Sequence, residues 1–222
     1  MRTTIESVMR FLARAAVCAA LGAAGIAQAQ NAAPVEAPDV LVKNVTLEVI
    51  DILAKDMEIQ SGNRSKLIEL IEAKVLPHFN FTSMTALALG QNWNKASADQ
   101  KKQLTEEFKT LLVRTYASAI ASFSGEKFDF RPLRAKPTDT DVTVNVRVLR
   151  PGTQPVPIDY AMEKTASGWK VYDVMVGGVS LVANYRTEFT NVVRSSGIDG
   201  LVKNLQTKNQ GAVPSTPALG KK

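Results

Sequence analysis

The residues that could perform nucleophilic or acid–base chemistry in this chain are few and far apart. His78 is the only histidine, and Ser180 and Asp173 are the residues that could join it in a catalytic triad. A triad needs a serine that the histidine activates and a carboxylate that orients the histidine. Ser180 does not lie in the Gly-x-Ser-x-Gly turn that presents such a serine in many hydrolases. The sequence therefore favours a structural or surface role for His78.

Asp173 is the strongest single candidate for a general base. The alternating pattern places it on one strand face with Trp169 and Val171, which predicts that it points inward. An isomerase with a hollow fold keeps its base as a buried carboxylate. The alternative is an ion pair or a hydrogen bond to a turn. We favour this alternative, because the sequence identifies no oxyanion donors around Asp173.

Metal and cofactor chemistry find no support in the sequence. Histidine, cysteine and carboxylate residues do not cluster at the spacing of zinc ligands. Phosphate-binding and dinucleotide-binding glycine motifs are missing, and a tight turn accounts for the pair Gly177-Gly178. The single cysteine, Cys18, lies in the N-terminal leader discussed next. We therefore expect no catalytic residue, no metal and no cofactor.

Residues 1–29 have the pattern of a cleaved signal peptide. Three arginines precede a short apolar run, and Ala27-Gln28-Ala29 places small residues at the cleavage site. The run is shorter than the roughly 20 apolar residues of a transmembrane helix. These features predict a soluble, secreted protein without disulfides.

The charge of the mature chain is weakly positive. The leader holds three arginines and one glutamate, which leaves +4 of the formal charge of +6. These charges are scattered, whereas a nucleic-acid-binding protein carries a basic stripe or patch. The balance suits approach to anionic lipid headgroups or acidic partners, and we expect no nucleic acid as partner.

Hydrophobic periodicity divides the rest of the chain into helices followed by strands. Asp39 is the expected N-cap of the first helix, Gly90 closes the third, and Ser97 with Gln100 forms a capping box for the longest. The predicted helices span residues 39–59, 65–76, 79–89, 97–122, 179–196 and 200–206, and the predicted strands span 127–133, 142–148, 156–162 and 169–176.

Helices first and strands joined by short turns afterwards are typical of an α+β fold. We predict helices packed across one face of a curved antiparallel sheet of about four strands, as in cone-shaped NTF2-like folds. Residues 39–206 form the single predicted domain, after a flexible lead-in at 30–38 and before a disordered tail at 207–222.

Short motifs in this order resemble the MlaC family of periplasmic phospholipid carriers, also known as the toluene-tolerance family. The resemblance extends from about Val40 to Leu205. The motifs that carry it are Leu76-Pro77-His78-Phe79, Leu89-Gly90, Thr115-Tyr116, Tyr172-Asp173, Gly178-Val179-Ser180-Leu181 and Gly197-Ile198-Asp199-Gly200-Leu201.

The resemblance implies a carrier that holds phospholipid acyl chains in an apolar cavity and maintains outer-membrane lipid asymmetry. Its partners would be an inner-membrane ABC transporter with an MCE-domain ring and an outer-membrane lipoprotein–porin complex. Phospholipid would be cargo, and the protein would not be an enzyme. Two alternatives stay open, namely an NTF2-like enzyme with Asp173 as base and a lipid-free periplasmic adaptor.

Under the resemblance, part of the apolar stripe and sheet face would line the lipid cavity. Lys170 and Arg186 are the expected headgroup contacts at its rim. Candidates for docking are Lys101, Lys102, Arg114 and Arg131, although we favour solvated charge as their explanation. The expected cavity residues are Phe79, Leu87, Phe108, Leu112, Tyr116, Val144, Val146, Ile158, Tyr160, Val171, Val174, Val179, Leu181 and Tyr185.

Overall fold

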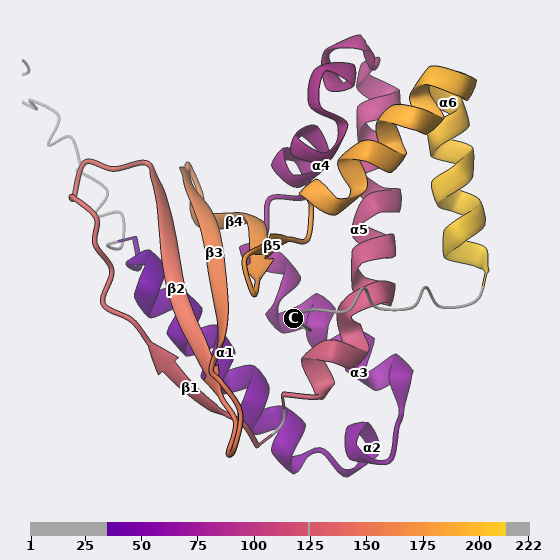
Figure 1. Cartoon of the computed structure of the whole chain (residues 1–222). Coiled ribbons are helices and arrows are strands. Elements are labelled where there is room, and N and C mark those ends of the chain that lie inside the picture. The colour runs from indigo at the N-terminus through magenta and orange to yellow at the C-terminus, as the bar shows by residue number, and fades with distance from the viewer. Residues whose placement is uncertain (1–34, 124, 212–222) are drawn as a thin grey trace, which may run out of the picture. The chain divides into compact units, whose positions relative to one another are not determined.

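The structure is a computed structural model that describes residues 35–123 and 125–211. The predicted signal peptide, most of the lead-in and the tail from residue 212 lie outside this range. The elements in chain order are α1 (Pro38–Lys55), α2 (Met57–Gln60), α3 (Arg64–Lys74), η1 (Leu76–His78), α4 (Phe81–Leu89), η2 (Gly90–Lys95), α5 (Ala98–Ala121), β1 (Lys127–Phe130), β2 (Asp141–Leu149), β3 (Val156–Thr165), β4 (Gly168–Val176), β5 (Val179–Ser180), η3 (Ala183–Tyr185) and α6 (Arg186–Gln210) (Figure 1).

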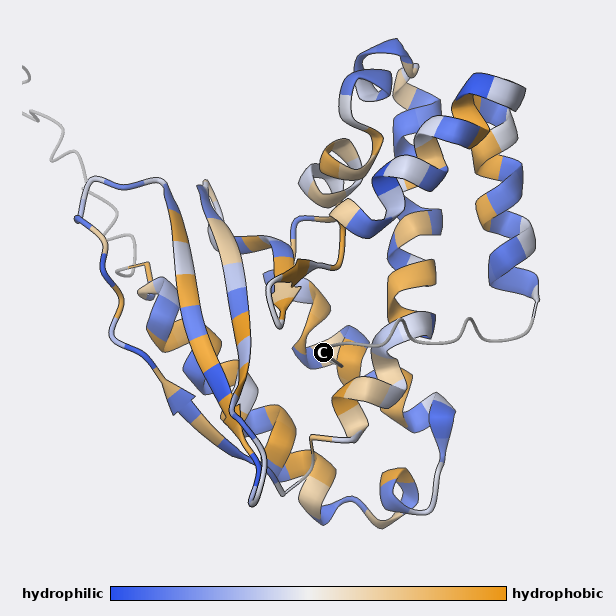
Figure 2. Cartoon of the chain, viewed as in Figure 1, coloured by the Kyte–Doolittle hydropathy of each residue, from blue (hydrophilic) through white to orange (hydrophobic). Residues whose placement is uncertain are grey.

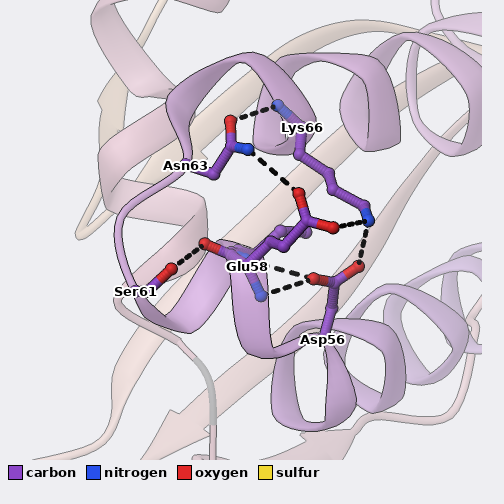
Figure 3. Close-up of polar contacts among 6 residues, drawn as sticks. Asp56, Glu58, Ser61, Asn63 and Lys66 are labelled. Atoms are coloured by element: carbon purple, nitrogen blue, oxygen red, sulfur yellow. Dashed lines mark hydrogen bonds and ion pairs between the residues drawn. The ribbon is translucent and has the colours of Figure 1, made fainter.

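The first predicted helix is interrupted by Asp56. The backbone of Asp56 is extended, which ends α1. The Asp56 carboxylate accepts hydrogen bonds from the amides of Glu58 and Ile59, so that Asp56 caps α2. The amide of Ile59 above all lowers the pKa of Asp56. Lys66 of α3 pairs with both Asp56 and Glu58, which fastens this corner of the chain (Figure 3). At the other end α1 begins with Pro38 after Ala37, so the prediction that Asp39 is the N-cap is wrong.

The end of α4 and the start of α5 lie at residues that the sequence identifies, whereas α4 begins two residues later than predicted. Asn80 caps α4 by accepting from the amide of Ser83. Gly90 follows α4 with a φ of 56°, a conformation that glycine adopts without strain. Ser97 and Gln100 form the predicted capping box at the start of α5.

The strands form one antiparallel sheet in the order β1-β2-β3-β4-β5. Along β2 buried valines alternate with exposed Thr143, Asn145 and Arg147, so one sheet face meets the helices and the other meets solvent. Figure 2 shows this alternation of apolar and polar residues along the strands. The predicted α+β class, with helices over an antiparallel sheet, is confirmed, and the sheet has five strands where about four are predicted.

The fifth strand replaces the first turns of a predicted helix. Gly177 and Gly178 have φ of 61° and 81°, and Val176 pairs with Val179 across them. Two consecutive positive φ values form the tight hairpin turn that matches the twist of antiparallel strands. The chain therefore turns into β5, and the prediction that a helix starts at Val179 is wrong, because α6 begins only at Arg186.

A β-bulge in β4 changes which side chains face the helices. Ala161 pairs with Asp173, but the next residue of β3, Met162, pairs with Val171, so Tyr172 is an extra residue. A bulge shifts the inward–outward alternation by one position. The predicted face of Trp169, Val171, Asp173 and Met175 is therefore correct only for its first two members.

Gly197 bends α6 sharply, with φ of 70° and ψ of −176° (Figure 1). The sequence predicts this break. The second arm continues to Gln210, so the prediction of a disordered tail is wrong for residues 207–210. Among the described residues, no helix is long and apolar enough to cross a membrane.

Three apolar clusters hold these elements together. The first joins α4, α5 and α6 around Phe108 and Phe189. The second joins the inner sheet face with the start of α1, including Leu41 and Val42. The third joins the second half of α1 with α2, α3 and α5, including Leu53. The helix α1 therefore connects the sheet with the α3–α5 layer.

Candidate functional site

An apolar cavity lies between the inner sheet face and the helices. The space open to the centre of a water molecule is about 230 Å³. The helices α1, α3, α4 and α5 and the strands β3 and β4 supply most of its wall. The lining residues are Leu41, Val42, Val45, Thr46, Val49, Ile50, Ile71, Val75, Leu76, His78, Phe79, Phe81, Met84, Leu112, Val113, Tyr116, Ala119, Ile120, Phe123, Phe128, Ile158, Tyr160, Met162, Val171, Val174, Val176 and Leu181.

Polar side chains are rare in this wall. Among the lining residues, only Thr46, His78, Tyr116 and Tyr160 carry a side-chain nitrogen or oxygen. Burial raises the pKa of Tyr160 to about 12, and its hydroxyl is hydrogen-bonded to Thr46 across the cavity wall. The cavity therefore suits a ligand made mainly of hydrocarbon, because a polar group brought here would lose its water without gaining partners.

Eight of the predicted cavity residues lie in this wall. They come from the C-cap of η1, from α5, from the sheet and from the segment after β5, and these segments lie far apart in the sequence. They are Phe79, Leu112, Tyr116, Ile158, Tyr160, Val171, Val174 and Leu181.

The other six predicted residues lie outside this wall. Leu87, Phe108 and Tyr185 pack in the α4–α5–α6 cluster. Val144 and Val146 face inward from β2, but the inner-face cluster of the sheet covers them. Val179 is 44% exposed in β5.

The sequence interpretation missed the contribution of α1. Leu41, Val42, Val45 and Val49 line the cavity from one side of this helix. Their spacing of one, three or four residues is the ordinary signal of a buried helix face. That signal predicts burial, but it does not tell whether the buried face meets side chains or an open space.

Asp173 does not line the cavity. It is 7% exposed and stands opposite Ala161, whose neighbours in β3 do line it. Its carboxylate accepts from the hydroxyl of Ser180 at 2.6 Å and from the amides of Val174 and Val182 at 2.8 and 3.3 Å. Ser180 in turn accepts from the amide of Ala183 at 2.8 Å. Asp173 therefore fastens β5 and the following turn, which is the structural alternative that the sequence favours.

His78 and Lys170 lie together at one edge of the cavity. His78 lines it, and the ammonium of Lys170 donates to the carbonyl of Pro77 at 2.6 Å. Partial burial, followed by the nearby charge of Lys170, lowers the pKa of His78. Among the described residues, no hydrogen bond joins His78 to Ser180 or Asp173, and no group of three potential metal ligands occurs. The geometry thus gives neither a triad nor a metal centre in this range.

Most of the other predicted charged contacts are engaged within the chain. The guanidinium of Arg186 donates twice to the carbonyl of Leu87. Arg114 donates to the carbonyl of Gly211, and Arg131 pairs with Asp129. Lys101 lies over the ring of Trp93 with 5.2 Å between its ammonium and the ring centre. These contacts stabilise the surface, and they do not mark a docking face.

Two curated relatives resemble the chain over most of its length. The intermembrane phospholipid transport system binding protein MlaC of Haemophilus influenzae is 24% identical over 159 residues, which is 70% of this chain and 74% of that protein. The toluene tolerance protein ttg2D of Pseudomonas putida is 21% identical over 165 residues, covering 74% of this chain and 76% of that protein.

A solved structure shares the fold at higher identity. It is the phospholipid-binding protein of Ralstonia solanacearum in complex with a phospholipid. The two chains are 35% identical and superpose with a TM-score of 0.72, covering 78% of this chain and 96% of the other. The sequence profile of the MlaC protein matches residues 43–207, which contain almost every lining residue of the cavity. The chain belongs to the MlaC family.

Proposed function

We propose that this protein is a periplasmic carrier that binds phospholipid by its acyl chains and moves it between membrane complexes. The observation that carries this proposal is the hydrocarbon wall of the cavity, in which only four side chains have a polar atom. Phospholipid is named in the description of a structural relative with the same fold. The protein would have no catalytic step, since Asp173 faces away from the cavity.

The energetics of a carrier require a balance. Removing two acyl chains from water is worth on the order of 20 kcal/mol, at about 0.8 kcal/mol per methylene. Donor and acceptor sites are themselves apolar, so the net free energy of transfer into the cavity is small. An apolar wall without strong polar contacts meets this requirement, because it holds the chains without fixing them to one partner.

The headgroup would stay outside, near Lys170. Lys170 is a half-buried residue whose ammonium donates to a backbone carbonyl, and none of the ion pairs among described residues includes it. An ammonium has three N–H donors, so two of those on Lys170 remain available to a phosphate. With a single such contact, we expect broad headgroup tolerance. Lys170→Gln should weaken binding of phospholipid by less than about tenfold, as for an exposed ion pair.

The proposal is tested by lipid extraction. The mature protein is purified from periplasm without detergent, and organic extracts are analysed by mass spectrometry. We expect near-stoichiometric phospholipid with two acyl chains. A protein that is empty and also takes no lipid from vesicles would contradict the carrier and favour the lipid-free adaptor.

A matched pair of variants on α1 assigns the lipid to the cavity. Ile50 lines the cavity, whereas Leu47 is 46% exposed on the same helix. Ile50→Glu places a carboxylate in the hydrocarbon wall and should abolish loading. Leu47→Glu should load normally. Equal loading of both folded variants would show that the lipid binds elsewhere.

The partners would be complexes in both membranes. We propose an inner-membrane ABC transporter with an MCE-domain ring and an outer-membrane lipoprotein–porin complex, as the family resemblance implies. Crosslinking of the periplasmic protein followed by identification of the bound chains tests this assignment. If only one of the two complexes were recovered, the proposal that the protein exchanges lipid with both membranes would be contradicted.

A further inference from the structure

The cavity has an open part and a deep end. Several lining residues of α1, η1 and the end of α5, among them Ile50, His78 and Ile120, are partly exposed. Lining residues near the middle of α5 are buried, and Tyr116 and Met84 are 7% and 3% exposed. An acyl chain that enters from the exposed part therefore meets Tyr116 and Leu112 last.

The lining residues of α5 run from Leu112 to Ile120, a length of about 12 Å along the helix. One turn before Leu112, on the same helix face, Phe108 is 0% exposed and does not line the cavity. The cavity therefore ends within one turn of the helix, at the level of Leu112 and Tyr116.

A packed aromatic cluster lies directly behind this end. The ring of Phe108 meets Tyr185 and Phe189 edge to face, with ring centres 5.1 and 5.2 Å apart. Rings in this arrangement fill space at core density. An acyl chain cannot pass beyond Tyr116 without displacing this cluster.

The deep end also changes in polarity. The hydroxyl of Tyr116 is buried next to the phenol of Tyr185, and burial, followed by that neighbour, raises the pKa of Tyr116. The Tyr116 oxygen has no well-formed hydrogen bond within the described part of the chain. A methylene group offers this buried hydroxyl no hydrogen bond, so an acyl chain gains no free energy by extending further toward it.

We propose that Tyr116 closes the acyl-chain cavity and limits the length of the chains that the protein carries. This inference rests on the proposed carrier function and adds a chain-length preference to it. The ring forms the end wall, and the Phe108–Tyr185–Phe189 cluster supports it from behind.

The test measures chain-length preference directly. The protein is incubated with vesicles that contain equal amounts of phosphatidylglycerols with short and long saturated chains, and the captured lipid is quantified by mass spectrometry. Tyr116→Ala should raise the long-to-short ratio by about tenfold, the change that burial of roughly two further methylenes would give. Tyr116→Trp should lower it. An unchanged ratio in either variant, with lipid bound, would overturn the proposal.

Two controls separate the end wall from other effects. Tyr116→Phe keeps the ring and should keep the ratio, which assigns the limit to the ring. Ile120→Ala enlarges the cavity one turn further along α5 and should leave the ratio unchanged. If Tyr116→Ala does not fold, the Tyr116→Trp ratio decides alone. A wild-type protein that captures no lipid at all would contradict the proposed function itself, a result distinct from an unchanged ratio.

Discussion

The two halves of α5 have the same kind of sequence and opposite surroundings. In the first half Leu104, Phe108 and Leu111 pack against α4 and α6 in a filled core. In the second half Tyr116, Ala119 and Ile120 face an open cavity. One continuous apolar stripe serves both. The difference comes from the partner elements, because α6 packs closely on the first half, while the sheet and α1 stand off from the second.

Filled and hollow regions should therefore respond differently to the same type of substitution. The filled half loses packing when a side chain is truncated, and the free energy of unfolding falls. The hollow half already borders a space, so truncation of a side chain there should change ligand binding more than the free energy of unfolding. The following experiments test this contrast, from the largest expected effect to the smallest.

Phe108→Ala should lower the free energy of unfolding by about 3–5 kcal/mol, since Phe108 is 0% exposed within the filled core. Ile120→Ala should cost about 1 kcal/mol, because Ile120 is partly exposed at the cavity. Urea unfolding of both variants, freed of lipid, measures the difference. Equal losses would mean that the hollow half is as tightly packed as the filled half.

Bound phospholipid should stabilise the hollow region selectively. At a free lipid concentration of about 100 Kd, binding adds about 2.7 kcal/mol to the free energy of unfolding. Hydrogen exchange should slow at the amides of residues 112–123 and of α1, and change little at residues 104–111. Uniform slowing along α5 would show that the two halves respond as one unit.

Asp173→Asn should destabilise the fold by about 1–3 kcal/mol, because the acceptor of three hydrogen bonds is weakened in a buried place. The folded variant should still load phospholipid, since Asp173 lies outside the cavity wall. Ser180→Ala, alone and combined with Asp173→Asn, shows by a double-mutant cycle whether the pair acts together. Loss of loading in a folded Asp173→Asn protein would return Asp173 to the functional site.

The smallest expected effect is the contribution of His78 to the pH dependence of the free energy of unfolding. Burial and Lys170 lower the pKa of His78 in the folded state, so the unfolded chain binds the proton more readily. The free energy of unfolding therefore has its full value above about pH 6.5, the pKa of histidine in the unfolded chain, and it declines as the pH falls below that value. Urea midpoints above and below that pH should differ less in His78→Gln than in the wild type.

Much of the fold follows from local residue patterns. The capping box at Ser97, the end of α4 at Gly90 and the break at Gly197 are all visible in the sequence and confirmed in the structure. These features depend on a residue and its near neighbours, so a single sequence contains enough to place them.

The cavity could be predicted only in part, because it depends on distant packing. Tyr116 and Phe108 are both aromatic positions of one stripe, yet only Tyr116 lines the cavity. The strand β5 escaped prediction for a similar reason. Val179 and Ser180 form a strand because the hairpin pairs them with Val176 and Met175, and not because of their own propensity.

The bulge at Tyr172 also bears on how a fold of this kind could change its use. If Tyr172 instead had a partner in β3 and followed Val171 in ordinary alternation, the Asp173 carboxylate would turn toward the hydrocarbon wall and Val174 away from it. A container for acyl chains would then hold a buried acid, the starting point of a catalytic pocket. Carrier and enzyme would then differ by one codon, which adds a residue to β3 between Ala161 and Met162, opposite Tyr172.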